Sequence, residues 1–520
     1  MSEEISVELS ELIRDLPLAA PKDAIEVHGV CHDSRQVEPG DLFVALAGAS
    51  HDGRLYAQQA VERGAVAVLA QGGPPANLPI PWLSSREDPR PLLGPVSARV
   101  YGHPERELTL VGVTGTNGKS TVATLISAVQ NAADRPAGTI GTLGYRFGRR
   151  KYAGSRTTPE ASDLFRTLRQ MRDEGAQAVT MEVSSHALSL GRVTGASYDL
   201  AVFTNLSRDH FDFHGDFESY MAAKRRLFDQ LKEGGVAVIH LGDAHALALA
   251  EDLLQRGCSV VTCQVEGSSG VSPLVWEGPE LVKVVVQGAQ LQATGTRARV
   301  VTPDGAYEIQ SPLVGRFNLE NLATAAAAAH ALGLPPEAVQ AAFAEQLPLP
   351  GRLEEVELAG KEGFREASVK AFVDFAHTDA ALAAALRSVK EISQGQVLVV
   401  FGCGGDRDTG KRFLMGKIAG ELSDLPIVTS DNPRTEDPHS IIAAVEEGLK
   451  ASGNPQYRVV PDRREAIHRA IAVAAPGSVV LVAGKGNEDV QLIGTQVLPF
   501  SDRKEIEQAL EERFGPMADR

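Results

Sequence analysis

The chain has 520 residues, of which 43% are hydrophobic and 23% are charged, and its net charge is −16. This is the composition of an ordinary globular protein, and a chain of this length exceeds a single hydrophobic core, so we expect about three domains. The acidic balance argues against nucleic acid or an anionic membrane as the principal partner. We therefore expect small-molecule substrates, no nucleic-acid binding and no insertion into a membrane.

The first 16 residues, MSEEISVELSELIRDL, are predicted to form an acidic amphipathic helix rather than a signal peptide. No apolar run reaches the length of a membrane span. A cytoplasmic location and a monomeric state are the default expectations. The four cysteines lack metal-ligand spacing and are too few for a disulfide framework, so we interpret them as reduced and structural. Cys403 lies in a glycine-rich loop, and a reactive thiol is the alternative interpretation.

Residues 1–103 alternate short apolar runs with turns, which predicts a small α/β domain. The predicted elements are strands near Ala24–Val30, Asp41–Ala47 and Ala65–Ala70, a helix near Leu55–Arg63, and a proline-flanked apolar run at Leu78–Leu83. This segment has no phosphate-binding loop, so we expect it to bind something other than a nucleoside triphosphate.

Residues 104–346 are predicted to form a central domain. Buried strands at Ala178–Val183, Leu200–Asn205 and Val236–His240 and an alanine-rich helix at Asn318–Leu332 indicate a parallel sheet covered on both faces. A more β-like insertion near Leu274–Val301 is expected to pair antiparallel at the sheet edge.

Two prolines and a glycine in Leu347–Gly351 predict a stiff joint before a last domain, residues 347–520. The predicted strands there are Phe372–Asp374, Gln396–Phe401, Pro426–Ser430 and Ser478–Ala483. Helices separate them, which indicates a Rossmann-like fold.

The stretch Leu110–Thr121 is the strongest functional motif. An apolar strand runs into a glycine turn and then a helix, which aims backbone N–H groups at one point and suits a polyphosphate. Lys119 would contact the β- and γ-phosphates, and the Ser120 hydroxyl would hold Mg²⁺. Val113 occupies the place of the first glycine of the general pattern, so a plain glycine turn with an exposed lysine is the alternative.

Further polar residues follow predicted strands of the central domain. Glu182 and His210 stand at strand ends, where ligands gather in parallel sheets, so we expect them at a magnesium site beside the phosphate loop. His186 and His214 have a structural interpretation as hydrogen-bonded groups.

Arginines follow two predicted strands of the last domain, in Asp406–Asp408 and Asp431–Arg434. Arginine suits planar carboxylate recognition, and a solvent-facing arginine beside acidic neighbours is the equal alternative.

Taken in order, these motifs resemble those of the Mur ligases, the ATP-dependent amide-bond-forming enzymes of peptidoglycan synthesis. The segments that carry the resemblance are Gly115–Thr121, Glu182 with Ser184-Ser185-His186, Asn205–His210, Lys224, Asn318 with Asn321, Pro350-Gly351-Arg352 and Asp374–Thr378. They span nearly the whole chain. The resemblance implies three α/β domains: a uridine-nucleotide-binding domain, a central P-loop ATPase-like domain with a parallel sheet, and a C-terminal Rossmann-like domain that binds an amino acid.

The resemblance also implies roles for particular residues. Lys119, Glu182, His210 and Lys224 would be catalytic, and Lys224 would be carbamylated and join Ser120, Glu182 and His210 in holding Mg²⁺. The implied ATP-binding residues are Gly115, Thr116, Asn117, Gly118, Lys119, Ser120, Thr121, Asn318, Arg352 and Asp374. The implied residues for a UDP-N-acetylmuramoyl-dipeptide are Ser34, Thr157, Thr158, Ser184 and Arg192, and Leu190 replaces a glutamine that some members use for this substrate. From its position alone, Lys224 is an ordinary surface lysine of a helix.

Within the family, Asp431–Arg434 resembles the signature of members that add meso-diaminopimelate. The implied contacts are Arg407, Asp431, Asn432, Arg434, Gly484 and Glu488. Asn487 replaces the usual histidine of this last loop. A ligase that uses L-ornithine or L-lysine is therefore one alternative, and a regulatory nucleotide-binding ATPase is another.

Overall fold

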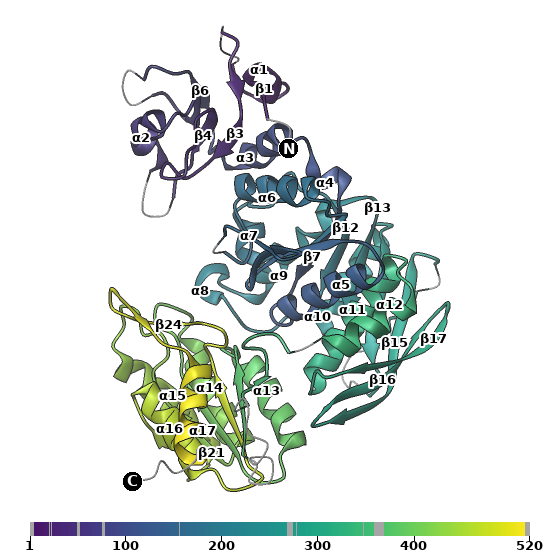
Figure 1. Cartoon of the computed structure of the whole chain (residues 1–520), viewed down its shortest axis with the longest axis vertical. Helices are drawn as coiled ribbons and strands as arrows, with labels where there is room; N and C mark the ends of the chain where they lie inside the picture. Colours follow the sequence, from purple (N-terminus) through teal and green to yellow (C-terminus); the bar gives the residue numbers. More distant parts are fainter. Residues whose placement is uncertain are drawn as a thin grey trace.

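The computed structural model describes residues 5–19, 21, 23–48, 52–74, 78–154, 156–267, 274–276, 278–346, 348–357 and 369–514. Three α/β units follow one another along the long axis of the molecule, with the N-terminal unit at one end and the C-terminal unit at the other (Figure 1). The predicted three-domain α/β fold class is confirmed. Within these ranges, no helix is long and apolar enough to cross a membrane.

The N-terminal unit is built on a four-stranded parallel sheet. Its strands are β3 (Gly29–Cys31), β4 (Asp41–Ala45), β5 (Ala67–Gln71) and β6 (Trp82–Ser85), and its helices are η1 (Gly53–Tyr56), α2 (Ala57–Glu62) and α3 (Arg90–Val100). A short helix, α4 (Pro104–Glu107), leads into the central unit.

The helix predicted for residues 1–16 is wrong. In the described part of this segment, β1 (Val7–Glu8) pairs antiparallel with β2 (Glu26–Val27), and only α1 (Leu9–Leu12) is helical. The backbone N–H of Leu9 donates to Ile25, so pairing with the second strand takes precedence over a continuous helix. Residues 1–4 lie outside the described ranges.

The central unit contains an eleven-stranded sheet, and its strand β7 (Thr109–Thr114) leads into the predicted phosphate loop. It lies between β11 (Ala178–Glu182) and β12 (Tyr198–Phe203), and both pair with it in parallel. The remaining strands are β8 (Ala137–Gly141), β9 (Gly144–Phe147), β10 (Arg150–Tyr152), β13 (Leu231–His240), β14 (Ser259–Val265), β15 (Leu281–Gln292), β16 (Gly295–Thr302) and β17 (Gly305–Ser311). At the sheet edge β15 pairs antiparallel with β16, and β16 with β17, as predicted, whereas β15 joins the rest of the sheet through a parallel pair with β14.

Helices cover both faces of this sheet, because side chains of successive strand residues point to opposite faces. On one face pack α5 (Lys119–Ala132), α11 (Arg316–Ala331) and α12 (Pro336–Glu345). The other helices are α6 (Ala161–Asp173), α7 (Ser185–Ser189), α8 (Phe211–His214), α9 (Phe217–Arg225), η2 (Phe228–Gln230) and α10 (Ala244–Gln255). The predicted alanine-rich helix is confirmed as α11, and its run Ala325–Ala329 is buried.

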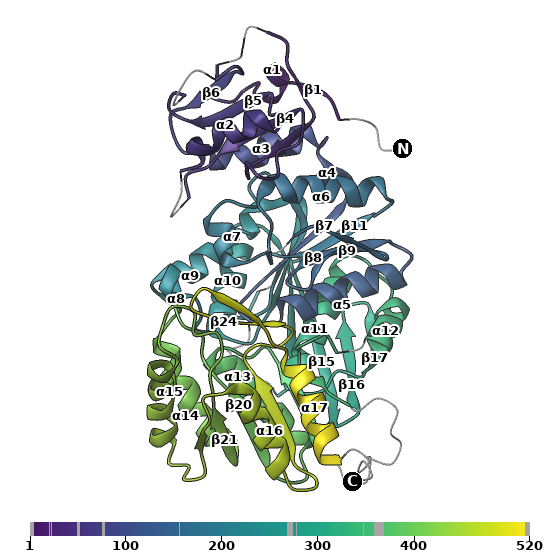
Figure 2. The same cartoon turned by 60° about the vertical axis from the view of Figure 1, so that its left-hand side comes forward.

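The C-terminal unit has a six-stranded sheet, parallel apart from its first strand. In sheet order the strands are β18 (Glu354–Glu355), β19 (Lys370–Asp374), β23 (Val479–Ala483), β20 (Val397–Phe401), β21 (Leu425–Val428) and β22 (Arg458–Val459). One face packs on α13 (Asp379–Ile392), α14 (Gly410–Leu422) and α15 (Pro438–Ser452), and the other on α16 (Arg463–Val473) and α17 (Asp502–Phe514). A hairpin of β24 (Val490–Ile493) and β25 (Gln496–Pro499) faces the central unit (Figure 2).

The four strands predicted for this last unit are confirmed. The boundaries at residues 103 and 347 stay predictions, and Leu347 of the expected joint lies outside the described residues.

Candidate active site

A cleft of about 760 Å³ is lined by residues of both the central and the C-terminal units. It opens at the carboxyl ends of parallel strands, which is where α/β sheets bind ligands. Most of the residues singled out from the sequence line it: Thr116, Asn117, Gly118, Lys119, Ser120, Thr121, Thr157, Glu182, Ser184, His210, Arg352, Asp374, Arg407, Asp431, Asn432, Arg434, Gly484 and Glu488.

The phosphate loop connects β7 to α5 through two glycines that no larger residue could replace. Gly115 has φ 144°, and a Cβ there would lie 2.0 Å from Thr204 Oγ1. Gly118 has φ 84°, and its Cβ would lie 2.4 Å from Asn321 Oδ1. Both glycines therefore permit a backbone path that brings the loop against neighbouring polar groups.

Asn205, at the end of β12, fixes the shape of this loop. Its carbonyl accepts from Thr116 N (2.9 Å), and its side-chain Oδ1 accepts from Asn117 N (2.9 Å). Lys119 folds over the loop and donates to the carbonyls of Gly115 (3.1 Å) and Thr116 (2.8 Å). Burial lowers the pKa of Lys119. Asn205 belongs to a motif that is visible in the sequence, but no binding or catalytic role was expected for it.

Lys224 lies behind the loop on α9 and is only 1% exposed. Its Nζ donates to the Gly115 carbonyl (2.8 Å) and lies 4.2 Å from the centre of the Tyr220 ring. Burial, and then the charge of Lys119, lower the pKa of Lys224 well below its ordinary value. The interpretation as a surface lysine is wrong, because the residue is internal and its amine is biased toward the neutral form.

Glu182 ends β11 with a buried carboxylate. Its Oε1 accepts from Thr142 N (2.8 Å) and its Oε2 from Thr142 Oγ1 (3.2 Å). Thr158 Oγ1 donates to the Glu182 carbonyl (2.9 Å), and Thr157 Oγ1 lies 3.1 Å from Thr142 Oγ1. Two of the residues expected at the nucleotide-sugar substrate are thus connected to the carboxylate expected at the metal.

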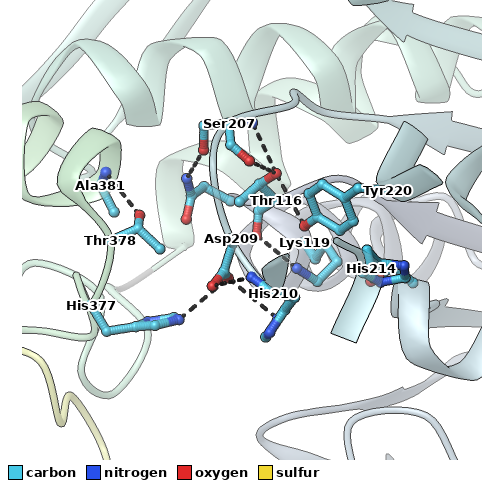
Figure 3. Close-up of polar contacts among 12 residues, drawn as sticks. Thr116, Lys119, Ser207, Asp209, His210, His214, Tyr220, His377, Thr378 and Ala381 are labelled. Atoms are coloured by element: carbon cyan, nitrogen blue, oxygen red, sulfur yellow. Dashed lines mark hydrogen bonds and ion pairs between the residues drawn. The ribbon is translucent and has the colours of Figure 1, made fainter. Parts of the chain in front are cut away.

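His210 is joined to a carboxylate that also contacts the C-terminal unit (Figure 3). Asp209 Oδ2 lies 3.3 Å from His210 Nε2 and 3.5 Å from His377 Nε2. Burial lowers the pKa of His210 to about 3. Burial alone would raise the pKa of Asp209, but His377 and His210 together hold it below its usual range. Asp209 and His377 were not singled out from the sequence, because nothing in their spacing shows that they meet.

The donor set suits a Mg²⁺ ion shared with a phosphate. Ser120, Glu182 and His210 line the same cleft and offer a hydroxyl, a carboxylate and an imidazole. In the part of the chain that the structure describes, no group of three or more His, Cys, Asp or Glu side chains could hold a metal. Mg²⁺ prefers oxygen ligands and usually shares phosphate oxygens, so this incomplete set fits such an ion.

Arg352 reaches across to the phosphate loop from the C-terminal unit. Its Nη2 donates to Ser120 Oγ (3.3 Å), and its guanidinium carbon lies 4.6 Å from the centre of the Phe375 ring. Asp374 accepts from Leu353 N (2.6 Å) and Ala376 N (2.8 Å), and burial raises its pKa.

Of the two asparagines on α11, Asn321 lines the cleft. Asn318, expected to bind ATP, is buried and donates through Nδ2 to the Val314 carbonyl (2.9 Å). Its Oδ1 accepts from Asn321 Nδ2 (3.2 Å), so it holds Asn321 in place.

Three residues expected at the muramoyl-dipeptide lie outside the cleft lining: Ser34, Arg192 and the buried Thr158, whose contact with the Glu182 carbonyl is given above. Ser34 belongs to the N-terminal unit, and its Oγ donates to Gln59 Oε1 (2.7 Å). Arg192 pairs with Glu160 at 2.9 Å, and burial lowers its pKa.

Arg434 and Arg407 form a basic end of the cleft in the C-terminal unit. Arg434 has φ 53°, an uncommon conformation for a residue with a side chain, and its Nη1 donates to the Gly405 carbonyl (2.7 Å). Burial, and then the charge of Arg407, lower the pKa of Arg434. Asp431, Glu488 and Asp406 offset part of this effect, and an anionic ligand would stabilise the two cations further.

Gly484 has φ 116°, and a Cβ there would lie 2.5 Å from Asp431 Oδ2. The bare backbone of this loop lets the Asp431 carboxylate approach the wall of the cleft.

The cysteines are free within the described residues. Burial raises the pKa of Cys403 to about 12, which favours the structural interpretation over a reactive thiol.

Comparisons with known proteins agree with this fold and site. Residues 26–102 match the model of the "Mur ligase family, catalytic domain", residues 113–329 that of the "Mur ligase middle domain", and residues 351–486 that of the "Mur ligase, glutamate ligase domain". The chain belongs to the Mur ligase family, whose members are ATP-dependent amide ligases.

The relatives bear a more specific name. The chain is 44% identical to the UDP-N-acetylmuramoyl-L-alanyl-D-glutamate--2,6-diaminopimelate ligase of Geobacter metallireducens, covering 94% of this chain and 95% of the relative. It is 42% identical to the ligase of the same name from Geobacillus thermodenitrificans, covering 92% and 94%. A solved structure of a ligase with that name is 31% identical, covers 98% of this chain and 99% of its own, and superposes with a TM-score of 0.64.

Proposed function

We propose that the protein joins meso-diaminopimelate to the D-glutamate γ-carboxylate of UDP-N-acetylmuramoyl-L-alanyl-D-glutamate, with ATP as the energy source. The observation that carries the proposal is one cleft with a phosphate loop on the central unit and a pair of arginines, Arg407 and Arg434, on the C-terminal unit. The relatives that carry this ligase name match over more than nine-tenths of the chain.

The first step activates the carboxylate. A γ-carboxylate oxygen attacks the γ-phosphorus of ATP, the bond between the γ-phosphorus and the bridging oxygen breaks, and an acyl phosphate and ADP result. Lys119 stabilises the charge that spreads over the transferred group, and the loop N–H groups orient the phosphates.

The second step forms the amide. The amine of the amino acid attacks the activated carbonyl carbon, the nitrogen loses a proton, and inorganic phosphate leaves. A cleft lined from two units keeps water away from the acyl phosphate, which would otherwise hydrolyse.

Mg²⁺ would be held by Ser120, Glu182, His210 and a carbamylated Lys224 together with phosphate oxygens, and would neutralise charge on the transferred phosphoryl group. Lys224 supports this role because its buried amine favours the neutral, nucleophilic form. Attack of that amine on carbon dioxide forms an N–C bond and releases one proton. The product is an anionic carbamate in place of a cation.

The remaining assignments follow from the same reaction. Ser34 would contact the uridine nucleotide in the N-terminal unit, and Thr157, Thr158, Ser184 and Arg192 would bind the muramoyl-dipeptide. ATP would use the phosphate loop with Asn318, Arg352 and Asp374. Cytoplasmic ATP and nucleotide-sugar pools would supply the substrates of a monomeric enzyme.

Selectivity for diaminopimelate would come from its second carboxylate. Arg434 and Arg407 would bind that group, while Asp431, Asn432, Gly484 and Glu488 would contact the amino acid around it. L-Lysine lacks the carboxylate and would leave the partly buried Arg434 guanidinium without this anionic partner, which is a penalty.

The test is phosphate release with ATP and the muramoyl-dipeptide, comparing meso-diaminopimelate, L-lysine and L-ornithine. A strong preference for diaminopimelate is the expected result. Activity mainly with lysine or ornithine would overturn the role of Arg434 and retain the ligase. ATP hydrolysis independent of both other substrates would instead identify a regulatory nucleotide-binding ATPase.

A further inference from the structure

Lys485 is a fully buried lysine in the loop that follows β23, and none of the roles above uses it. Its Nζ donates to Asn432 Oδ1 (2.9 Å) and to Glu488 Oε2 (3.1 Å). Both partners line the cleft, whereas Lys485 does not reach its wall. The ammonium group thus lies directly behind two residues expected to contact the amino acid.

The hydrogen bonds of Asn432 fix which end of its amide faces which neighbour. Oδ1 accepts from Lys485 Nζ and from Leu492 N (2.9 Å), and Nδ2 donates to Glu488 Oε2 (2.8 Å). A reversed amide would place its NH₂ against two donors and its oxygen against a carboxylate. The lysine, which can only donate, therefore sets the orientation of the amide.

Glu488 is held by one oxygen only. Its Oε2 accepts from both Asn432 and Lys485, while Oε1 accepts no hydrogen bond from any residue that the structure describes. The Glu488 side chain is 37% exposed, in contrast to the 0% of Lys485. One carboxylate oxygen is anchored in the protein, and the other is left for a ligand in the cleft.

We propose that Lys485 is a positioning residue for the amino acid substrate, which it orients by holding Asn432 and Glu488 so that the free carboxylate oxygen meets a substrate ammonium group. This inference rests on the proposed function, because it assigns the substrate of that same cleft. Lys485 does not touch the substrate and acts through its two partners.

A lysine suits this position because its ammonium group is fully buried and its charge strengthens both hydrogen bonds. Replacing it by an apolar side chain would leave the Asn432 oxygen with one donor fewer and release the Glu488 carboxylate. Binding of the amino acid would weaken, whereas the phosphate loop belongs to the other unit and would be unaffected.

The experiment uses Lys485→Met in the full-length enzyme, with Lys450→Met as the matched control. Lys450 Nζ also lies 3.1 Å from a glutamate carboxylate, that of Glu446, but on the exposed surface of α15. Lys485→Gln is made in parallel, because glutamine keeps one donor at the buried position and guards against a variant that fails to fold. Circular dichroism and the melting temperature check the fold of each variant.

Two quantities are measured. The first is the KM for each of the three substrates. The second is the amount of acyl phosphate formed without amino acid, which is trapped with hydroxylamine. For Lys485→Met we expect the KM for the diamino acid to rise at least about tenfold, as for loss of hydrogen bonds to charged groups. The KM values for ATP and the muramoyl-dipeptide and the trapped acyl phosphate should stay at wild-type levels. Lys485→Gln should show a smaller rise, and Lys450→Met no change.

A double variant tests whether Lys485 acts through Glu488. Once Glu488→Gln is present, adding Lys485→Met should raise the KM by less than it does alone, because the two residues share one interaction. The inference would be overturned if the effects of the two substitutions on the KM multiplied as independent effects do. An unchanged KM in a folded Lys485→Met variant would also overturn it, as would a loss of acyl phosphate as large as the loss of amino acid binding. Failure of the wild-type enzyme to form acyl phosphate would overturn the proposed function, and this inference with it.

Discussion

Two lysines converge on a single carbonyl oxygen, that of Gly115. Lys119 Nζ lies 3.1 Å and Lys224 Nζ 2.8 Å from it. Burial, and then repulsion from the nearby ammonium group of Lys119, lower the pKa of the more deeply buried Lys224 well below its ordinary value. The residue proposed to react with carbon dioxide is thus the one whose pKa the surroundings lower most strongly toward the neutral amine.

Lys224→Ala should abolish amide formation, because no carbamate can form, and small carboxylic acids should restore part of the activity by supplying the missing anion. Lys224→Arg should be inactive without rescue, because it keeps a cation and fills the space. Phosphate release with and without acetate measures both effects. Lys417→Ala, an exposed lysine paired with Glu421 on α14, is the control. Full activity of Lys224→Ala would remove the carbamate from the mechanism.

Arg434→Ala should lower kcat/KM for meso-diaminopimelate by roughly 10- to 100-fold, as for loss of a charge-assisted hydrogen bond. The same change should barely affect the low activity with L-lysine, which has no second carboxylate. The ratio of the two kcat/KM values is the measurement, and Arg458→Ala, which replaces an exposed arginine of β22, is the control. An equal loss with both amino acids would assign Arg434 to folding of its loop instead.

At the scale of elements, buried strands were the most predictable part of the chain. The runs at Ala178–Val183 and Gln396–Phe401 are mostly apolar, and every residue of the strands that they form, β11 and β20, is buried, as expected for strands covered on both faces. The prediction of an N-terminal helix was wrong because amphipathic spacing describes only the local sequence. The pairing of β1 with β2 depends on a segment 20 residues away.

The site was predictable where a motif is continuous in sequence, as in the phosphate loop. The site was not predictable where the residues that contact one another come from distant segments of the sequence. The contact of Asp209 with His377 joins two units, and the burial of Lys224 depends on how α9 packs behind the loop. Neither is encoded in spacing along the chain.

Two helices of the C-terminal unit are joined at their first residues by a buried ion pair. Arg463 of α16 donates from Nε (2.8 Å) and Nη2 (2.7 Å) to the Asp502 carboxylate of α17, and both side chains are fully buried. Arg463 Nη2 also donates to the Ala483 carbonyl at the end of β23 (2.9 Å). The pair thus fixes both helices to the strand that leads into the amino acid loop.

Arg463→Met should lower the free energy of unfolding by about 3–5 kcal/mol, because it leaves the Asp502 charge buried and unpaired. Arg469→Met is the matched control: Arg469 also lies on α16 and pairs with Glu465, both side chains are exposed, and this pair should contribute less than about 1 kcal/mol. Urea denaturation of both variants, with hydrogen exchange of α16 and α17, measures the difference. Equal stability of the two variants would show that the buried pair does not hold these helices.

At the scale of the whole molecule, polar contacts among the described residues join the central and C-terminal units at three places. Arg208 and Asp408 form a two-point ion pair (3.0 and 3.2 Å), Asp209 meets His377, and Arg352 meets Ser120. Gly410 permits the close approach, because a Cβ there would lie 2.3 Å from Arg208 Nη2. Arg208 and Asp209 are consecutive, so one short loop couples the expected metal ligand His210 to the position of the other unit.

Asp408→Asn should weaken the association of the central and C-terminal units by about 1 kcal/mol or more, because the neutral amide keeps the shape of the side chain but loses the ion pair. Without ligands, small-angle scattering should report a larger radius of gyration for the variant than for the wild type, and saturating ATP analogue with muramoyl-dipeptide should reduce the difference. Glu421→Gln, which breaks an exposed pair within α14, controls for the change in charge. If the units are held by this pair, 0.5 M salt should expand the wild type toward the variant, since a partly exposed ion pair is screened. Superimposable profiles for all proteins would mean that the other two contacts, and the apolar packing beside them, set the arrangement of the cleft.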